Sequence, residues 1–193
     1  MKKWVATVLA LVMALSVTTM AWAEGNWTGS GTEADPYVIT TEAGLNKLAT
    51  DVNNGTVYCD TYFKLGASIT VTDWTPIGQK GSDNKFAGTF DGNGQTVTIN
   101  GINSGLGSAF DGYAGFFGAV KGATIKNLTV AGTISGSDVA GVVARLDGAS
   151  KVINCINKAN VTGTSKAAGI TVKIDGTNVV IDDCTNDGEI KSN

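Results

Sequence analysis

Apolar and polar residues recur at a nearly constant interval in the second half of the chain. Each repeat has an apolar residue, an Asn or Asp two positions later, then Leu or Cys, and finally Ile or Val. The aligned segments are 125–134, 152–161 and 181–190, at offsets of 27 and 29 residues. Short β-type segments separated by Gly, Asn and Asp at such a period are typical of a β-solenoid.

The repeat predicts which side chains share the interior. Successive coils of a β-solenoid pair as parallel strands about 4.8 Å apart, so equivalent side chains stack in columns. We therefore expect two inward columns of apolar residues in this half of the chain. The first is Leu128, Cys155 and Cys184, and the second is Ile134, Val161 and Ile190.

Small and short polar residues mark the corners of the expected coils. Asn127, Asn154 and Asp183 fall where each coil bends, and such side chains can bond the local backbone. A second matched block begins each repeat, and its glycines are expected at tight corners or close backbone approaches. These glycines are Gly115, Gly141 and Gly169. The clearest repeats therefore cover residues 114–193.

The segment around residues 41–53 has a helical pattern instead. Its apolar residues lie at i, i+3, i+4 and i+7 and form one stripe. They are Leu45, Leu48, Ala49 and Val52. Thr40 or Thr41 can cap the start of this helix. We expect it to cover the open end of the first coil, with a cap region over 24–66 and β-helix coils over 67–193.

The first 23 residues have the pattern of a secretory signal peptide. Lys2 and Lys3 precede an apolar run, and Ala21-Trp22-Ala23 places small residues at a cleavage site after Ala23. Cleavage would leave 170 residues, and no later stretch reaches the roughly 20 apolar residues of a membrane span. We therefore expect a secreted or extracellular cell-surface protein with no membrane span after cleavage.

Composition excludes several kinds of chemistry. The chain has 193 residues and no histidine, which removes His-dependent triads, His metal ligands and His acid–base catalysis. Its net charge is -3, and the mature chain, without two lysines, would carry 12 - 17 = -5. This charge disfavours a nucleic-acid partner. We expect no cofactor, no metal site and no catalytic residues.

Three cysteines remain after cleavage, and an odd number cannot all pair within the chain. Cys155 and Cys184 could be redox thiols or a disulfide, or small buried apolar residues. The second interpretation is favoured because Leu128 occupies the same position one coil earlier. Side chains stacked in register also give poor disulfide geometry. The sequence leaves the state of Cys59 open.

Several segments together resemble the GLUG-motif family of bacterial exported proteins. They are 31–39, the helix at 41–53, 62–65, 74–78, 90–94 and the Gly-rich repeats. In the first repeat, Gly115-Phe116-Phe117-Gly118 keeps both glycines of the motif, whereas the later repeats keep only the first glycine. The resemblance implies an all-β, right-handed parallel β-helix (β-solenoid) at the bacterial surface, with an N-terminal capping α-helix. Such relatives occur in adhesin-like proteins and beside the peptidase domain of IgA-specific metallopeptidases.

The leading functional hypothesis is a non-enzymatic secreted or cell-surface module, adhesin-like or a structural repeat region of a larger protein. Its partners would be host or cell-surface glycans or proteins, which extended solenoid faces suit. The chain ends soon after the last repeat, so we also expect either a fragment of a longer protein or an end that meets a partner.

Two alternatives stay open. One is a carbohydrate-binding or carbohydrate-active β-helix, a lyase or glycosidase, for which Asp182-Asp183 is the adjacent acidic pair. Trp27, Trp74 and Tyr113 could then be stacking platforms, although core packing is the simpler role. The other is ice binding through threonines at 70–72 and 96–98, which lie 26 residues apart.

Overall fold

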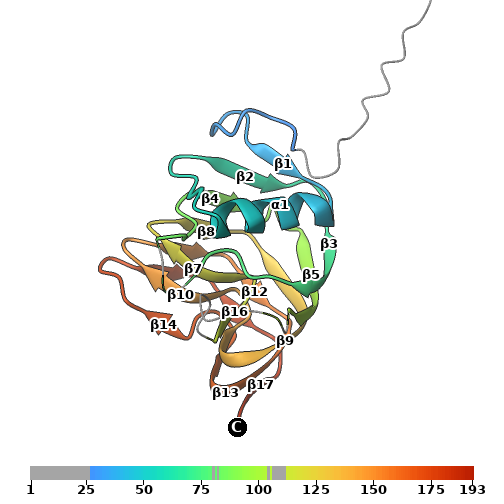
Figure 1. The fold of residues 1–193 in the computed structure, drawn as a ribbon, viewed down its shortest axis with the longest axis vertical. Helices are drawn as coiled ribbons and strands as arrows, with labels where there is room; N and C mark the ends of the chain where they lie inside the picture. Colours follow the sequence, from blue (N-terminus) through green and yellow to red (C-terminus); the bar gives the residue numbers. More distant parts are fainter. Residues whose placement is uncertain (1–26, 80, 82, 104, 106–111) are drawn as a thin grey trace, which may run out of the picture.

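The chain winds through about five coils of a parallel β-solenoid (Figure 1), which confirms the predicted fold class. The structure, a computed structural model, describes residues 27–193 except 80, 82, 104 and 106–111. The signal peptide expected over residues 1–23 lies outside the described residues. Each coil contributes strands to three walls, which we call sheets A, B and C.

Sheets A and B form the longer walls. Sheet A consists, in spatial order, of β1 (Tyr37–Ile39), β2 (Tyr62–Leu65), β4 (Thr89–Asp91), β8 (Thr124–Lys126), β11 (Lys151–Ile153) and β15 (Val180–Asp182). Sheet B consists of β3 (Ile69–Trp74), β5 (Thr96–Ile102), β6 (Tyr113–Ala114), β9 (Thr129–Ala140), β12 (Ile156–Asn157), β13 (Asn160–Ala168), β16 (Thr185–Asn186) and β17 (Ile190–Ser192). All pairings between these strands are parallel.

Sheet C closes the third side. It consists of β7 (Phe117–Lys121), β10 (Val143–Asp147) and β14 (Lys173–Ile174), again in parallel. Two isolated parallel bridges, Ile77 to Phe117 and Phe86 to Val120, continue this wall towards the N-terminus.

The strand register stacks equivalent residues of successive coils. Val152 pairs with Ile125 on one side and with Ile181 on the other. Val161 pairs with Ile134 and with Ile190 in the same way. Side chains at these positions therefore stack on one another along the solenoid axis.

The interior of the middle coils is mainly apolar, and it becomes more exposed at the last coil. Leu128 and Cys155 are buried, and Cys184 in the last coil is partly exposed. Ile134 and Val161 are buried, and Ile190 is partly buried. The large apolar side chains Ile174, Val180 and Ile181, all in the last coil, are exposed. Burial is therefore lower in the last described coil than in the middle coils.

The bends between sheets A and B use left-handed backbone. Asn127, Asn154 and Asp183 have φ values of 53°, 50° and 48°, a region that Asn and Asp tolerate better than most residues. Their side chains differ from our expectation, because the amides bond one another instead of the local backbone. Asn154 Nδ2 donates to Asn127 Oδ1 at 2.9 Å, and Asn127 Nδ2 donates to Asp91 Oδ1 at 3.0 Å. The bends are therefore tied together along the axis.

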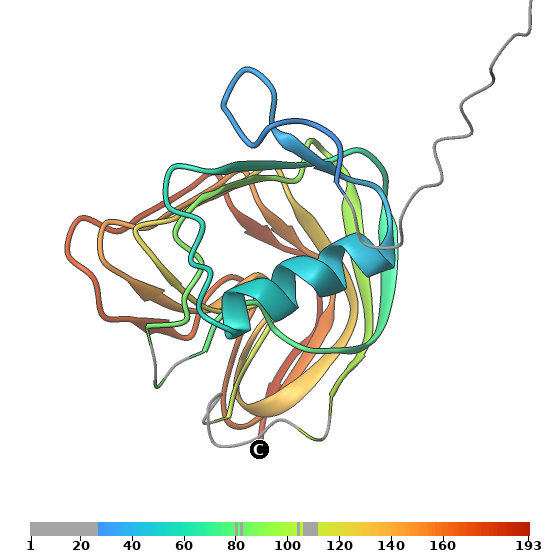
Figure 2. The same cartoon turned by 45° about the horizontal axis from the view of Figure 1, so that its top comes forward.

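The helix α1 (Glu42–Asn53) lies across the N-terminal end of the solenoid, as Figure 2 shows. Thr41 caps it by accepting the backbone N–H of Gly44 through Oγ1 at 3.1 Å. Its apolar stripe faces the first coil, and every member of the stripe is at most 2% exposed. The members are Leu45, Leu48, Ala49 and Val52. The stripe therefore shields the apolar residues of the first coil from water.

The repeat glycines allow the walls to approach closely. A Cβ on Gly141 would collide with the amide of Asn157 and lie 2.5 Å from the carbonyl oxygen of Gly169. A Cβ on Gly169 would collide with Asn186. In the coil before, a Cβ on Gly115 would lie 2.7 Å from the carbonyl oxygen of Ala140. Each glycine therefore leaves room for the neighbouring coil, and in two cases for an inward amide.

Candidate functional site

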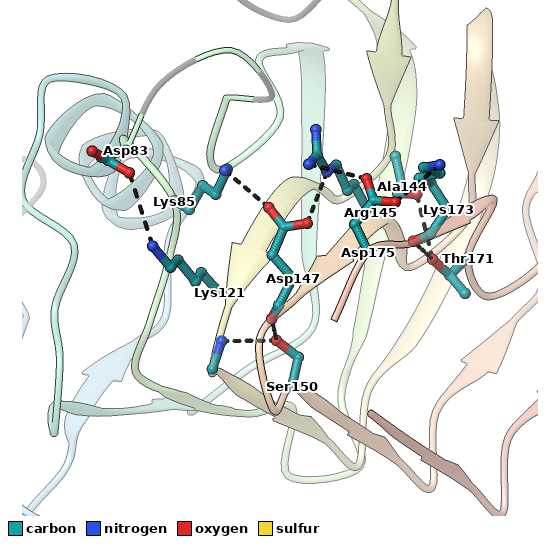
Figure 3. A network of polar contacts seen from close by, with 11 residues as sticks. Asp83, Lys85, Lys121, Ala144, Arg145, Asp147, Ser150, Thr171, Lys173 and Asp175 are labelled. Atoms are coloured by element: carbon teal, nitrogen blue, oxygen red, sulfur yellow. Dashed lines mark hydrogen bonds and ion pairs between the residues drawn. The ribbon is translucent and has the colours of Figure 1, made fainter. Parts of the chain in front are cut away.

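A network of charged side chains covers sheet C and is drawn in Figure 3. At its centre, the Asp147 carboxylate is 7% exposed and accepts Arg145 Nε at 2.8 Å and Lys85 Nζ at 2.9 Å. Arg145 also contacts Asp175 at 3.0 Å, and Asp175 contacts Lys173 at 2.9 Å. These ion pairs join the segment before β4 to the last two coils.

This network is suited to holding coils together. Each buried or half-buried charge in it has a partner of the opposite sign, including Lys85, which borders a concavity of about 360 Å³ but is already paired with Asp147. The Asp147 backbone is held too, since Ser150 donates to its carbonyl oxygen at 2.6 Å and accepts the Gly122 N–H at 2.9 Å. We interpret the network as a clamp between coils rather than as catalytic machinery.

A concavity of about 470 Å³ lies between α1 and β3. It is lined by amides and hydroxyls, but the central side chain is already engaged in structure. Asn53 Oδ1 accepts the Gly78 N–H at 2.9 Å, and its Nδ2 donates to the Pro76 carbonyl at 3.0 Å. Gln79 Nε2 donates to the Asn53 carbonyl oxygen at 3.3 Å. These bonds fasten the end of the helix to the loop after β3.

The outer face of sheet A carries a groove of about 270 Å³. Strand alternation aims its side chains, because Phe63 and Leu65 of β2 point into the core and Tyr62 and Lys64 point outward. The adjacent strands present Thr89, Asp91 and Lys126 on the same face, in register with β2. The loop before β1 overhangs these strands and completes the groove with Glu33, Ala34 and Pro36.

The groove differs from the other two regions in its unused polar groups. Among the described residues, Tyr62, Lys64 and Glu33 make no side-chain hydrogen bond, ion pair or ring contact. Asp91, by contrast, is engaged with Asn127 and lies 3.5 Å from Lys126 Nζ. The groove therefore combines a phenol ring, one ammonium group and one carboxylate that are all available to a ligand. We take it as the candidate binding site.

The aromatic residues singled out in the sequence have structural roles. Trp74 is fully buried, stacks on Phe116 at 5.4 Å and donates to that residue's carbonyl oxygen at 3.1 Å. Tyr113 is 5% exposed. Trp27 packs between Tyr37 and Phe63 and donates to the Gly44 carbonyl at 3.0 Å. The sequence reasoning missed Tyr62, which the alternation Tyr62-Phe63-Lys64-Leu65 could have placed on an outer face.

The cysteines are all unpaired thiols in three different environments. Burial raises the pKa of the Cys155 thiol to about 12, and burial also raises the pKa of the Cys184 thiol. Cys59 is exposed, at the end of the segment that leads into β2. High thiol pKa values leave the two stacked cysteines poorly nucleophilic. They therefore resemble core residues more than reactive ones.

The other candidate sites are placed as follows. Asp182 and Asp183 are both exposed, and Asp183 holds the left-handed bend of the last coil. The threonine array has a different register from the expected one, because Thr70 pairs with Thr98 at an offset of 28 residues. The next strand then places Ala131 beside Thr98, so the row of hydroxyls ends after two strands.

The described ranges contain no cluster of three or more His, Cys, Asp or Glu side chains that could hold a metal ion. No helix in the same ranges combines the length and the hydrophobicity required to cross a membrane.

Similarity to known proteins is partial. No family model matches the chain. The chain is 29% identical to Halomucin of Haloquadratum walsbyi over 169 residues, which is 83% of this chain and 2% of Halomucin. It is 31% identical to a protein of Evansella cellulosilytica named "Putative Gly-rich membrane protein" over 113 residues, which is 54% of this chain and 12% of that protein. The chain thus spans a small part of these curated relatives.

A solved structure supports the fold. The crystal structure of a "putative immunoglobulin A1 protease" from Bacteroides ovatus is similar with a TM-score of 0.57 and 18% sequence identity. The similarity covers 86% of this chain and 60% of that chain. At this identity it shows that the two chains share a β-helix-like fold, and no more.

Proposed function

We propose that the chain is a non-enzymatic, adhesin-like binding module that acts at or outside the cell surface as part of a larger assembly of repeats. The observation that carries the proposal is the outer face of sheet A, where the strands β2, β4 and β8 present polar side chains in register: Tyr62, Lys64, Thr89, Asp91, Thr124 and Lys126. Such faces suit extended ligands. The resemblance to the GLUG-motif family favours the same role.

The similar proteins support the proposal in a limited way. The matched segments are 2% of Halomucin and 12% of the Evansella protein, so in both cases the similar region is a small part of a much longer chain. One of those chains carries "membrane protein" in its name. Where several binding modules are linked in one chain, multivalency strengthens binding without a tight individual site.

The state of the carboxylates favours binding over catalysis. A glycosidase needs two carboxyl groups that face one scissile bond. Asp147 and Asp175 are engaged with Arg145, and Asp91 is engaged with Asn127 and Lys126, which leaves Glu33 as the one carboxylate of the sheet A groove without a partner among the described residues. A non-enzymatic role therefore fits the side-chain geometry better than the lyase or glycosidase alternative.

A binding assay with a matched activity assay tests the proposal. The full chain, fluorescently labelled on the exposed Cys59 thiol outside the groove, is titrated onto intact epithelial cells, bacterial cells and mucin-coated beads, with heat-unfolded protein as control. We expect saturable binding to at least one surface, and no new reducing ends or unsaturated uronates from a polysaccharide panel. Turnover of any polysaccharide, or the absence of saturable binding to all three surfaces, would contradict the proposal.

A further inference from the structure

We propose that the groove on the outer face of sheet A binds a neutral saccharide, with one sugar ring stacked on Tyr62. The inference rests on the proposed function and deepens it by naming a ligand class and a position. Three features of the groove support it: a free aromatic face, polar groups whose charges balance, and a frame anchored in the core.

The aromatic face is supplied by Tyr62, which is partly exposed and points outward from β2. Other tyrosines of the cap region are engaged, since Tyr37 packs against Trp27 at 5.3 Å and Tyr58 packs against Phe63 at 5.0 Å. Tyr62 has no ring partner among the described residues. A tyrosine ring offers an apolar face with a polar tip, which suits a ligand with the same division. The C–H face of a sugar ring has that character.

The charges of the groove favour a neutral ligand. Lys64 and Lys126 are balanced by Glu33 and Asp91, so the groove carries no net formal charge. The chain as a whole is negative, at -3, which disfavours a polyanion over longer distances. Sugar hydroxyls both donate and accept hydrogen bonds. They can therefore donate to the Glu33 carboxylate and accept from the Lys64 ammonium group, neither of which has a partner among the described residues.

The frame of the groove is rigid before any ligand arrives. Phe63 and Leu65 anchor β2 in the core with at most 1% exposure, which fixes the directions of Tyr62 and Lys64. The overhanging loop is held by backbone N–H groups of Ser30 and Gly31 that both donate to the Asp35 carbonyl at 3.0 Å. Pre-formed geometry reduces the ordering cost of binding. At about 270 Å³ the groove is below the usual range for drug-sized ligands, so it suits a single ring.

The experiment is an amide chemical-shift titration of the full chain, labelled with ¹⁵N. The probes are the methyl glycosides of glucose, galactose, mannose and N-acetylglucosamine, with glucuronate and galacturonate as charged comparisons. We expect at least one neutral glycoside to shift the amides of Tyr62, Lys64 and Thr89, with little change in sheet C. Uronates should bind more weakly.

Substitutions at Tyr62 test whether the glycoside binds in the groove. Tyr62→Ala should weaken binding of that glycoside by about tenfold or more, as expected for an aromatic anchor, and Tyr62→Phe should retain most of the affinity. Lys151→Ala is the matched control, because Lys151 lies on the outer face of sheet A beyond the groove and is exposed. The amide spectrum of each variant verifies that the fold is intact.

Several results would overturn the inference: no neutral glycoside shifts the groove, only uronates do, or Tyr62→Ala binds as tightly as the wild type. The cell-binding assay separates these failures from failure of the proposed function. If Tyr62→Ala still binds cells as the wild type does, the surface-binding role stands and another face carries it. If the wild type binds no cell or bead, the proposed function itself fails.

Discussion

The substitution Leu128→Ala tests the stacked interior most sharply. Leu128 is 1% exposed, and the preceding coil places Gly92 directly against it, with the Leu128 Cα only 2.5 Å from the position of a Gly92 Cβ. Glycine has no side chain that could move into the space left by the leucine. The equivalent residue in the next coil, Cys155, is small and is itself fully buried.

Leu128→Ala should therefore lower the free energy of unfolding by about 3–5 kcal/mol, in the upper part of the range for large-to-small core substitutions. Leu128→Cys is the matched control, because it installs the residue that the following coils use. This substitution removes about two buried carbon atoms, each of which contributes about 0.8 kcal/mol, so we expect the free energy of unfolding to fall by roughly 1.5–2 kcal/mol. The smaller cost of the control would show that the site tolerates the residue of the repeat.

The assay is urea unfolding followed by far-ultraviolet circular dichroism and by fluorescence of the buried Trp74. Leu128→Ala should lower the midpoint while the slope stays unchanged. A loss below about 0.5 kcal/mol, the size of an ordinary surface effect, would place Leu128 outside the core and refute the register.

Three further predictions follow from single contacts. Cys155 should react with a thiol reagent only on unfolding, while Cys59 reacts at once. Because burial raises the Cys155 pKa to about 12, the stability contributed by this thiol should be complete below its usual pKa of about 8.5 and should decline as the pH rises towards 12. Urea unfolding at a series of pH values measures this decline. Asp147→Asn should cost about 3 kcal/mol by the same unfolding assay, because two partly buried cations lose their central carboxylate; an unchanged midpoint would remove the clamp interpretation. Gly141→Ala should cost about 3 kcal/mol or more, because its Cβ would collide with Asn157; a folded variant of wild-type stability would show that the walls are farther apart.

The repeats of the second half could be read from the sequence because their periodicity is direct. Each coil there places one apolar residue at the same distance from one Asn or Asp, so aligning 125–134 with 152–161 and 181–190 also aligns the strands. The pairing of Val152 with Ile125 and Ile181 reproduces that alignment. Fold class follows because parallel stacking is the arrangement that buries all of these short segments together.

Register in the first half could not be read in the same way, because the corners differ in length. Four residues separate Asp91 from Thr96, whereas two separate Lys126 from Thr129, although both pairs of end residues are in register. A fixed period counted through corners of unequal length therefore gives a wrong register, as for the threonines, which are 26 residues apart in the expected alignment and pair at an offset of 28. The length of a corner depends on local turn geometry, such as the left-handed Asn93 with φ of 52°, and not on the hydrophobic pattern.

Only part of the candidate groove could be predicted from the sequence. Alternation in Tyr62-Phe63-Lys64-Leu65 places Tyr62 and Lys64 on one face, which the sequence alone could have indicated. The overhanging wall could not be predicted, because it depends on the contact of the loop before β1 with β2, where the Tyr62 N–H donates to the Gly31 carbonyl oxygen at 2.9 Å. A long-range approach of this kind leaves no periodic signal in the residues that make it.

The most direct test of the stacked solenoid is a set of cross-strand nuclear Overhauser contacts in the labelled full chain. The account predicts amide-to-α-proton contacts, in the parallel pattern, that link Val152 to both Ile125 and Ile181 and link Val161 to both Ile134 and Ile190. Close α-proton to α-proton contacts typical of antiparallel pairs, or contacts shifted by a residue, would contradict it.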